Sequence, residues 1–274
     1  MFRYVSSQGE RDTEADLSDI ELERHGAVAI VAINRPAKRN ALSGEAWREL
    51  GGAFTQLHAD DALRAIILTG RGGAFCAGDE IGAFAAVRDD PPARQVYWDG
   101  IMACYAAVSA ARVPVIAAVS GPCVGGGCTL ALRADFRIAD ATARFGVPPA
   151  KLGLVYPADS TQLLAATAGL SMARHMLYTG ALIGAEAALS CGLVSDVVED
   201  DVVEAALRFA RPMLANAPLS IRAAKLACDA IQLGRLADVA ANVAALSDAA
   251  DRSEDYREGT RAFAEKRKPV FTGR

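Results

Sequence analysis

Apolar and polar positions along the chain predict a series of strands. Short apolar runs at 27–33, 65–69 and 115–119 have the length of buried strands and are bounded by Gly, Pro and other turn residues. The first run is expected to pair with 20–24 as a hairpin, because only His25 and Gly26 separate the two. The chain therefore begins its ordered part as a β structure.

Helical spacing alternates with these strands. Ser43 can cap a helix whose apolar positions recur from residue 47 to 57, and a second helix is predicted within 91–111. A third, short apolar helix at 128–133 follows three glycines. Strand, glycine loop and helix thus recur, as the stacked right-handed turns of a spiral require.

The C-terminal quarter of the chain has a different character. From residue 201 the pattern is almost entirely helical and Ala-rich, with expected breaks at 217–218, 234 and 252–253. The composition changes near Pro212, so we place a core at 19–211 and a small helical part at 212–274. Residues 1–18 have little apolar periodicity and are expected to form a flexible N-terminal tail.

Two glycine loops are the stretches most suggestive of chemistry. Gly125, Gly126 and Gly127 open the short helix at 128–133, and the loop 71–81 follows another strand. Bare backbone and the unpaired amides of a helix start suit negative charge. A phosphate loop or a dinucleotide fingerprint needs spacings that are absent here. An oxyanion hole, with one amide from each loop, is the remaining use.

These loops and several further motifs resemble the enoyl-CoA hydratase/isomerase (crotonase) superfamily. The resemblance runs from about residue 20 to the C-terminus and rests on segments in the family's order: 34–36, 40–42, 75–81, 118–130, 134–139, 145–146, 152–154, 187–194 and 257–267. It implies an α/β fold, the crotonase (ClpP-like) spiral of repeated ββα units, with a C-terminal helical trimerisation subdomain. It also implies an acyl-CoA thioester as partner and a homotrimer or a dimer of trimers.

The resemblance assigns the oxyanion amides to Asp79 and Gly126. Hydratases of the family also carry two glutamates that grip a water molecule, and this chain departs at both positions, with Thr129 and Pro149. Neither side chain can act as a general acid or base near neutral pH. Isomerase, decarboxylase or lyase chemistry through a thioester enolate is therefore expected over hydration. The alternative is a non-catalytic or regulatory acyl-CoA-binding protein.

Two further side chains are candidates for catalysis. Tyr156 stands where relatives that lack a glutamate place a Tyr or Asp, so it can donate a proton or orient a substrate, or else simply pack in its loop. Asp159 is a second candidate, although it also fits as the N-cap of the next helix. Glu80 fits a solvated loop carboxylate better than an acid. The same fold serves serine peptidases, but Ser120 lacks their sequence context.

Coenzyme A contacts are expected at two places. In the family, the loop with Arg35, Lys38 and Ala41 meets the nucleotide end of coenzyme A, and Ala77 adds a contact from the first glycine loop. Phe263 and Lys266 resemble a segment that a neighbouring subunit lends to the same nucleotide, although a basic helix end also fits a solvated surface. No other cofactor and no metal is expected.

Composition and charge limit the possible partners. A net charge of −4 and a pI near 5.5 argue against nucleic acid. Six cysteines without a paired spacing are expected to be reduced thiols. The N-terminal residues lack a signal pattern, and no apolar run approaches about 18 residues, so a cytoplasmic protein without membrane contact is expected.

Overall fold

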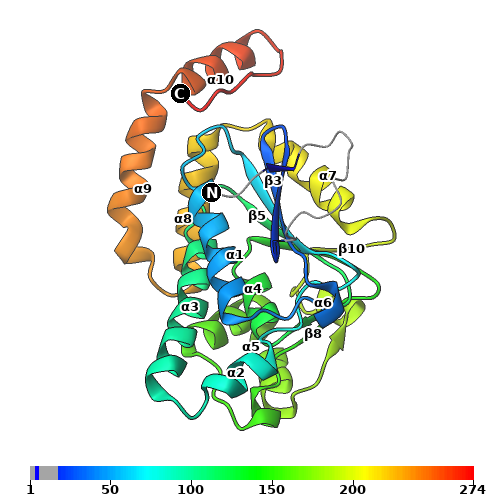
Figure 1. Cartoon of the computed structure of the whole chain (residues 1–274). Coiled ribbons are helices and arrows are strands. Elements are labelled where there is room, and N and C mark those ends of the chain that lie inside the picture. Colours follow the sequence, from blue (N-terminus) through cyan, green and yellow to red (C-terminus); the bar gives the residue numbers. More distant parts are fainter. Residues whose placement is uncertain (1–3, 6–17) are drawn as a thin grey trace.

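The computed structural model of the chain describes residues 4–5 and 18–274. In this part of the chain the strands form a seven-stranded sheet in the order β1-β2-β3-β4-β5-β7-β10 and a three-stranded sheet in the order β6-β8-β9 (Figure 1). The strands are β1 (Tyr4–Val5), β2 (Ile20–His25), β3 (Val28–Ile33), β4 (Ala65–Gly70), β5 (Val115–Val119), β6 (Pro122–Val124), β7 (Phe136–Asp140), β8 (Arg144–Gly146), β9 (Ile183–Gly184) and β10 (Asp196–Val198).

Ten helices and two 3-10 turns connect these strands within the described residues. They are η1 (Pro36–Lys38), α1 (Gly44–Leu57), α2 (Ile81–Val87), α3 (Pro91–Ser109), α4 (Gly126–Leu132), η2 (Pro149–Leu152), α5 (Ala158–Thr179), α6 (Ala185–Ser190), α7 (Val202–Leu214), α8 (Pro218–Gln232), α9 (Leu236–Asp251) and α10 (Glu254–Ala264).

Strand pairing in the large sheet follows the predicted order. β2 and β3 are antiparallel around Gly26, whose φ of +59° is a turn conformation that glycine adopts without strain. β3, β4, β5, β7 and β10 are parallel neighbours, with Ile30 opposite Ile67 and Ile67 opposite Ile116. The predicted hairpin and the strands at 65–69 and 115–119 are confirmed.

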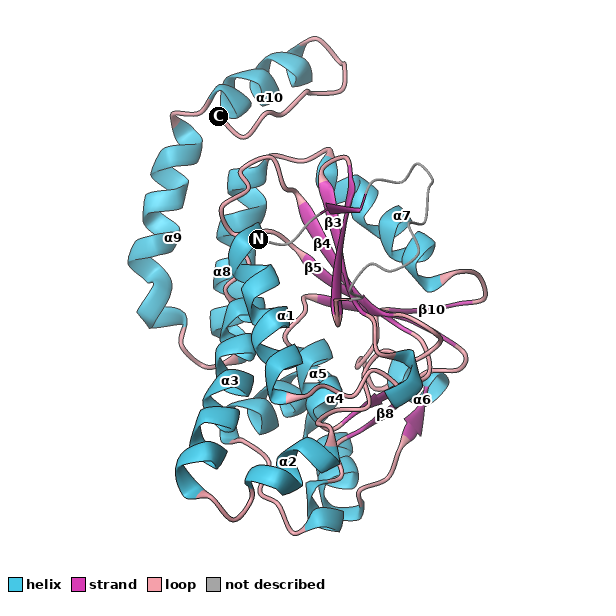
Figure 2. Ribbon diagram, viewed as in Figure 1, coloured by secondary structure: helices cyan, strands magenta, loops and turns pink. Residues whose placement is uncertain are grey.

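Side chains alternate between the two faces of this sheet, as the period of two in a strand requires. Val31, Leu68 and Ala117 belong to the core shared with the helices on one face, including α1 and α3, and Ile30 and Ile67 belong to the core under α7 on the other. Figure 2 shows the sheet between these helical layers. Parallel strands buried on both faces explain the continuous apolar runs in the sequence.

The sequence from β5 to α5 builds the ββα units of a spiral. β5 joins the large sheet, β6 joins the small one and α4 follows; β7 and β8 repeat this division before α5. The spiral architecture expected from the resemblance is therefore confirmed. Its consequence for function is that the loops after β4 and β5 meet where the two sheets diverge.

The C-terminal helices break close to the expected positions, after α7, α8 and α9. The expected boundary at Pro212 lies inside α7, so the division of the chain into a core and a C-terminal part stays a prediction. The expected flexible tail falls mostly outside the described residues; Tyr4–Val5 form β1, parallel to β2. No helix of the described segments combines the length and the hydropathy of a membrane span.

Candidate active site

Two glycine loops lie side by side at the carboxyl ends of β4 and β5. The Cys76 amide donates to Pro122 O at 2.9 Å, and the Val124 amide donates to Cys76 O at 3.0 Å. A side chain on Gly127 would place its Cβ 2.1 Å from Cys76 O, so glycine is required for this approach. The backbone ladder fixes the first loop against the start of α4.

This ladder brings Asp79 next to Gly126. A Cβ on Gly78 would lie 3.2 Å from the Gly126 amide nitrogen, and Gly78 has a φ of +96°. Leu42 bonds to Gly78 O and to the Glu80 amide, at 2.8 and 2.9 Å, so the Asp79 peptide between them faces the other way. The two amides expected from the sequence therefore lie together.

The Gly126 amide is open to a ligand. Gly126 is the first residue of α4, and no hydrogen bond from its amide is found in the described part of the chain. Helix starts leave such amides without intrahelical acceptors. This amide is one of the two donors that an oxyanion hole needs.

The Asp79 side chain turns into the same space. Its Oδ1 accepts a hydrogen bond of 3.0 Å from Trp47 Nε1, and its own backbone amide lies close enough to the carboxyl to lower its pKa. A methyl group on Gly126 would lie 3.1 Å from Asp79 Oδ2. Burial raises the pKa of Asp79 above its ordinary value of 3.8, and the Trp47 hydrogen bond opposes this only in part.

Tyr105 connects the components of the site. Its hydroxyl donates to Gly126 O at 3.2 Å, its ring meets the Trp47 ring edge-on at 5.4 Å, and the Arg133 guanidinium lies 5.3 Å from its ring centre. Burial raises the pKa of Tyr105 well above its ordinary value, so the phenol stays neutral. The hydrophobic pattern of the sequence identifies Trp47 and Tyr105 only as apolar positions of predicted helices. The indole N–H and the phenol O–H could have indicated a role in the site, because buried Trp and Tyr usually form hydrogen bonds through these groups.

Thr129 on α4 and Tyr156 form a pair of hydroxyls, and Thr129 is buried. Their oxygens lie 2.6 Å apart, and Thr129 also donates to Gly125 O at 3.2 Å. Burial raises the pKa of the half-buried Tyr156. Pro149, at the other position where the resemblance expects a glutamate, opens η2 and has no functional group.

Asp159 is not the N-cap of α5, which corrects one expectation. The cap is Pro157, and Asp159 lies inside the first turn. Its carboxylate instead binds Arg133 at 2.6 Å and accepts from the Ser160 amide at 2.7 Å. Burial alone would raise the pKa of Asp159, but the hydrogen bond from Arg133 and its charge lower it. Asp159 reaches the site only through Arg133.

The basic residues expected to meet coenzyme A are paired with Glu80. Arg35 Nη2 lies 2.8 Å from Glu80 Oε2, and Lys38 bonds to the other oxygen of that carboxylate. These bonds, with Lys38 contributing most, lower the pKa of Glu80. Arg35 also donates to Ala41 O, and the Ala77 amide donates to Arg39 O at 3.0 Å. Glu80 is thus an ion-pair partner in this loop.

Phe263 and Lys266 lie far from the site within this chain. Figure 1 shows α10 at one end of the molecule and α4 in its middle. The Phe263 side chain is 87% exposed, and α10 contacts α9. A role for these residues at the candidate site would therefore require a second chain.

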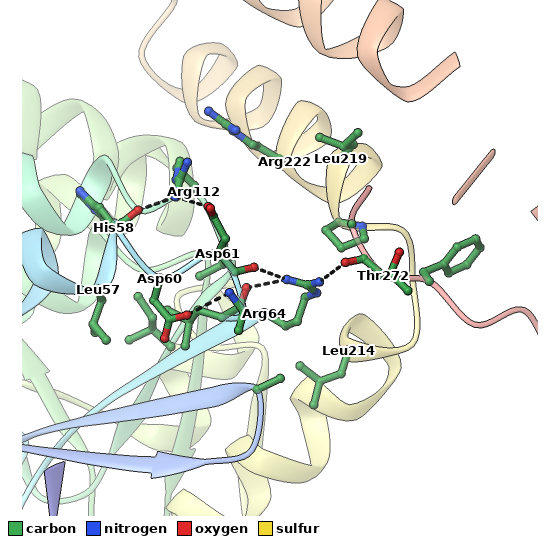
Figure 3. A pocket seen from close by; sticks show the side chains of 18 of the residues that line it. Leu57, His58, Asp60, Asp61, Arg64, Arg112, Leu214, Leu219, Arg222 and Thr272 are labelled. Carbon is green, nitrogen blue, oxygen red and sulfur yellow. Dashed lines mark hydrogen bonds and ion pairs between the residues drawn. The ribbon is translucent and has the colours of Figure 1, made fainter. Parts of the chain in front are cut away.

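A cavity of about 850 Å³ lies at the opposite edge of the sheet. Its lining includes residues that precede β3, β4 and β5, whereas Asp79 and Gly126 follow β4 and β5. Figure 3 shows Arg64 and Arg112 there, bonded to Thr272 O at 2.8 Å and to Asp61 Oδ1 at 3.1 Å. Ligands of parallel α/β sheets bind beyond the carboxyl ends of strands, so this cavity is not the expected substrate site.

Comparison with known proteins identifies the family. The family model described as enoyl-CoA hydratase/isomerase matches residues 23–274. The chain belongs to the enoyl-CoA hydratase/isomerase family. A short-chain-enoyl-CoA hydratase of Clostridium acetobutylicum is 35% identical over 260 residues, covering 92% of this chain and 97% of the relative. A 2,3-dehydroadipyl-CoA hydratase of Escherichia coli is 34% identical, covering 94% and 100%.

Solved structures give the same result for this enoyl-CoA hydratase/isomerase family member. A structure described as a putative enoyl-CoA hydratase/isomerase family protein from Hyphomonas neptunium superposes with a TM-score of 0.87 at 36% identity, covering 93% of this chain and 98% of that one. The crotonase fold expected from the sequence is confirmed. The protein is an acyl-CoA enzyme of this family.

Four cysteines surround the candidate site of this family member. Cys76, Cys104, Cys123 and Cys128 are buried, Cys191 is half-buried and Cys228 is exposed. Burial raises the pKa of the Cys76 thiol to about 12, and it raises those of Cys104 and Cys123 as well. Thiols in such surroundings stay protonated and unreactive near neutral pH. In the described residues, no cluster of His, Cys, Asp or Glu side chains could hold a metal ion.

Proposed function

We propose that the protein transforms a coenzyme A thioester through an enolate held by the Asp79 and Gly126 amides. The observation that carries this proposal is the backbone ladder between the two glycine loops, which sets these amides side by side at the carboxyl ends of the strands. Hydrogen-bond donors fixed where negative charge develops stabilise such an intermediate strongly.

The reaction is isomerisation, decarboxylation or a retro-addition. Water addition needs a general acid and a general base. On the face of α4 that carries position 129, the polar group is the Thr129 and Tyr156 hydroxyl pair, and position 149 is a proline. Tyr156 can give a proton to an enolate, and Asp159 acts through Arg133. Similar proteins that are named hydratases favour the opposite expectation, namely addition of water.

A panel of acyl-CoA thioesters tests this proposal, with products identified by mass spectrometry. The panel includes crotonyl-CoA and 2,3-dehydroadipyl-CoA alongside branched and carboxylated acyl groups. We expect turnover of at least one ester and a loss of about 3 kcal/mol of transition-state stabilisation in Gly126→Pro, which removes one amide donor. Gly82→Ala is the control, since a Cβ there has no neighbour within 4 Å. Full activity of the Gly126→Pro variant would refute the proposed oxyanion hole.

A non-catalytic acyl-CoA-binding protein is the second candidate. One observation favours it: the Asp79 carboxyl lies beside Gly126 and near its own amide, so the space of the proposed hole is partly occupied. If the esters of the panel bind and none of them is converted to a product, the protein is a non-catalytic acyl-CoA-binding protein.

We also propose that the chain assembles as a homotrimer or a dimer of trimers. Phe263 is exposed at the far end of α10, and α9 has no buried residue in a single chain. We expect light scattering to give a mass of three or six chains. Lys266→Ala in such an assembly should weaken coenzyme A binding, whereas a monomer would contradict the shared site.

A further inference from the structure

Asp79 places a carboxyl group where the proposed enolate oxygen would bind. Its Oδ2 lies beside Gly126, and the carboxyl is near the Asp79 backbone amide, which lowers its pKa. Trp47 Nε1 holds Oδ1 at 3.0 Å, so this orientation is fixed from α1. The carboxyl and the thioester oxygen therefore compete for the same amide.

An ionised carboxyl is incompatible with an oxyanion at this position. Two negative charges at hydrogen-bond separation in a partly buried site repel strongly, and one of them is then protonated. An ionised Asp79 would also bind its own amide more strongly than a neutral carbonyl oxygen could, because charged acceptors form the stronger hydrogen bonds. Binding of the thioester at the hole thus requires that this charge be removed.

We propose that the Asp79 carboxyl works in its neutral form, releasing its own amide to the thioester oxygen and donating a third hydrogen bond to it. The inference rests on the proposed function of the two glycine loops. Oδ1 continues to accept from Trp47, and Oδ2 carries the proton toward the space beside Gly126. The proton stays on Asp79 throughout, so no other group has to replace it.

The surroundings of Asp79 favour the neutral form. α1 contributes the uncharged Trp47, and α4 contributes the Gly126 backbone. α3 contributes Tyr97 and Tyr105, whose phenols have raised pKa values through burial and the nearby Asp79 charge. Cys76, on the same loop, has a thiol pKa of about 12.

Two cations near this loop are engaged by another carboxylate. Arg35 and Lys38 bond to Glu80, one residue beyond Asp79. Burial raises the pKa of Asp79 in these surroundings. Carboxylic acids kept neutral by apolar surroundings serve as oxyanion donors in other enzymes.

Two matched ligands isolate the carbonyl oxygen in an experiment. Butyryl-CoA carries the thioester carbonyl, and S-butyl-CoA is the thioether that lacks only that oxygen. The ratio of their affinities, measured by calorimetry between pH 4.5 and 9, reports the hole alone, because the nucleotide and the alkyl chain are common to both. Binding of S-butyl-CoA also shows that each variant is folded.

The neutral-acid role predicts a specific pH dependence. A raised pKa means that Asp79 is protonated below it, so the wild-type ratio should be high at low pH and fall about tenfold as pH rises through that pKa, as expected for loss of one to two hydrogen bonds. Asp79→Asn keeps a donor and cannot ionise, so its ratio should stay high at every pH. Asp79→Ala should give a lower ratio that is independent of pH.

Three results would overturn the inference. A wild-type ratio that is constant or rises with pH would show that the neutral form is not required. An Asp79→Asn ratio well below that of wild type at low pH would show that the side chain does not act as a donor. A protein that binds neither ligand at any pH would overturn the proposed function itself, and this inference with it.

Discussion

The hydroxyl oxygens of Thr129 and Tyr156 lie 2.6 Å apart, one on α4 and one in the loop before α5. Thr129 can direct its single hydroxyl hydrogen to Gly125 O at 3.2 Å. In that arrangement Tyr156 donates within the pair. The Tyr156 hydroxyl therefore lies beside α4 as a candidate proton donor.

Replacing Tyr156 with Phe tests this proton directly. The ring and its packing remain while the donor is lost, so turnover of the best ester should fall about 10²- to 10⁴-fold, the usual contribution of general acid catalysis. Steady-state kinetics with the ester chosen from the panel measures the effect. Thr129→Val, which removes the acceptor and keeps the shape, is the matched variant and should lose much less. Equal, small losses in both would assign Tyr156 to packing.

Hydration of crotonyl-CoA should be very slow in the wild-type protein. No carboxylate pair holds a water molecule at positions 129 and 149, so turnover should lie far below the usual range of about 1 to 10³ per second. Thr129→Glu with Pro149→Glu should raise it. Because Thr129 is buried against Tyr156, adding Tyr156→Ala makes room for the new glutamate. The loss of crotonyl-CoA absorbance measures the rate, and an ordinary hydratase rate in wild type would contradict the proposed reaction class.

Glu80 should weaken coenzyme A binding by neutralising Arg35 and Lys38. Glu80→Gln frees Lys38 and removes one of the two carboxylates paired with Arg35, whose other partner is Asp19 at 3.1 Å. The affinity for coenzyme A should therefore rise roughly three- to tenfold at low salt and less at high salt. Calorimetry at two ionic strengths measures this. Glu186→Gln, an exposed position on α6, changes the net charge equally and should have little effect.

The pH dependence of this pair has a defined sign. The pKa of Glu80 is lowered from 4.5, so its ion pairs persist above that value and are lost as pH falls through the lowered pKa. The affinity gain of Glu80→Gln over wild type should therefore shrink in strong acid. A gain that is identical at all pH values would exclude the ion pairs as its cause.

Lys225 should be a large contributor to stability. Its ammonium is nearly buried and bonds to both oxygens of Asp135 at 2.8 Å, and Asp135 in turn accepts from the Val115 amide at 2.7 Å. Lys225→Met leaves the Asp135 charge uncompensated, which typically costs about 3 to 5 kcal/mol of unfolding free energy. Urea unfolding measures this loss. Lys268→Met at the surface is the control, and a loss below about 1 kcal/mol would show that the pair is replaceable.

Local signals in the sequence were sufficient for most of the fold. Ser43 accepts from the Ala46 amide at 3.2 Å, as a capping serine should, and the apolar runs became parallel strands buried on both faces. The prediction that Asp159 is the N-cap of α5 was wrong. The Asp159 carboxylate instead forms an ion pair with Arg133, which is distant in sequence. Side-chain competition of this kind is invisible to a pattern of neighbouring residues.

The site was predictable only in its backbone. Glycine spacing indicated the two loops, and the ladder between them confirms that they meet. Trp47 and Tyr105 were missed because their helices converge on the loops through tertiary packing, and a helical pattern gives only the apolar face. The direction of the Asp79 side chain, likewise, depends on Trp47 from another element.

The distribution of thiols makes the protein convenient for site-selective labelling. The buried thiols of Cys76, Cys104 and Cys123 have raised pKa values and are shielded, whereas Cys228 on α8 is exposed. A maleimide fluorophore at neutral pH should attach at Cys228, and Cys191→Ser would remove the half-buried competitor. A dye placed there leaves the loops untouched, so ligand binding and chain assembly can be followed by fluorescence without altering the chemistry under study.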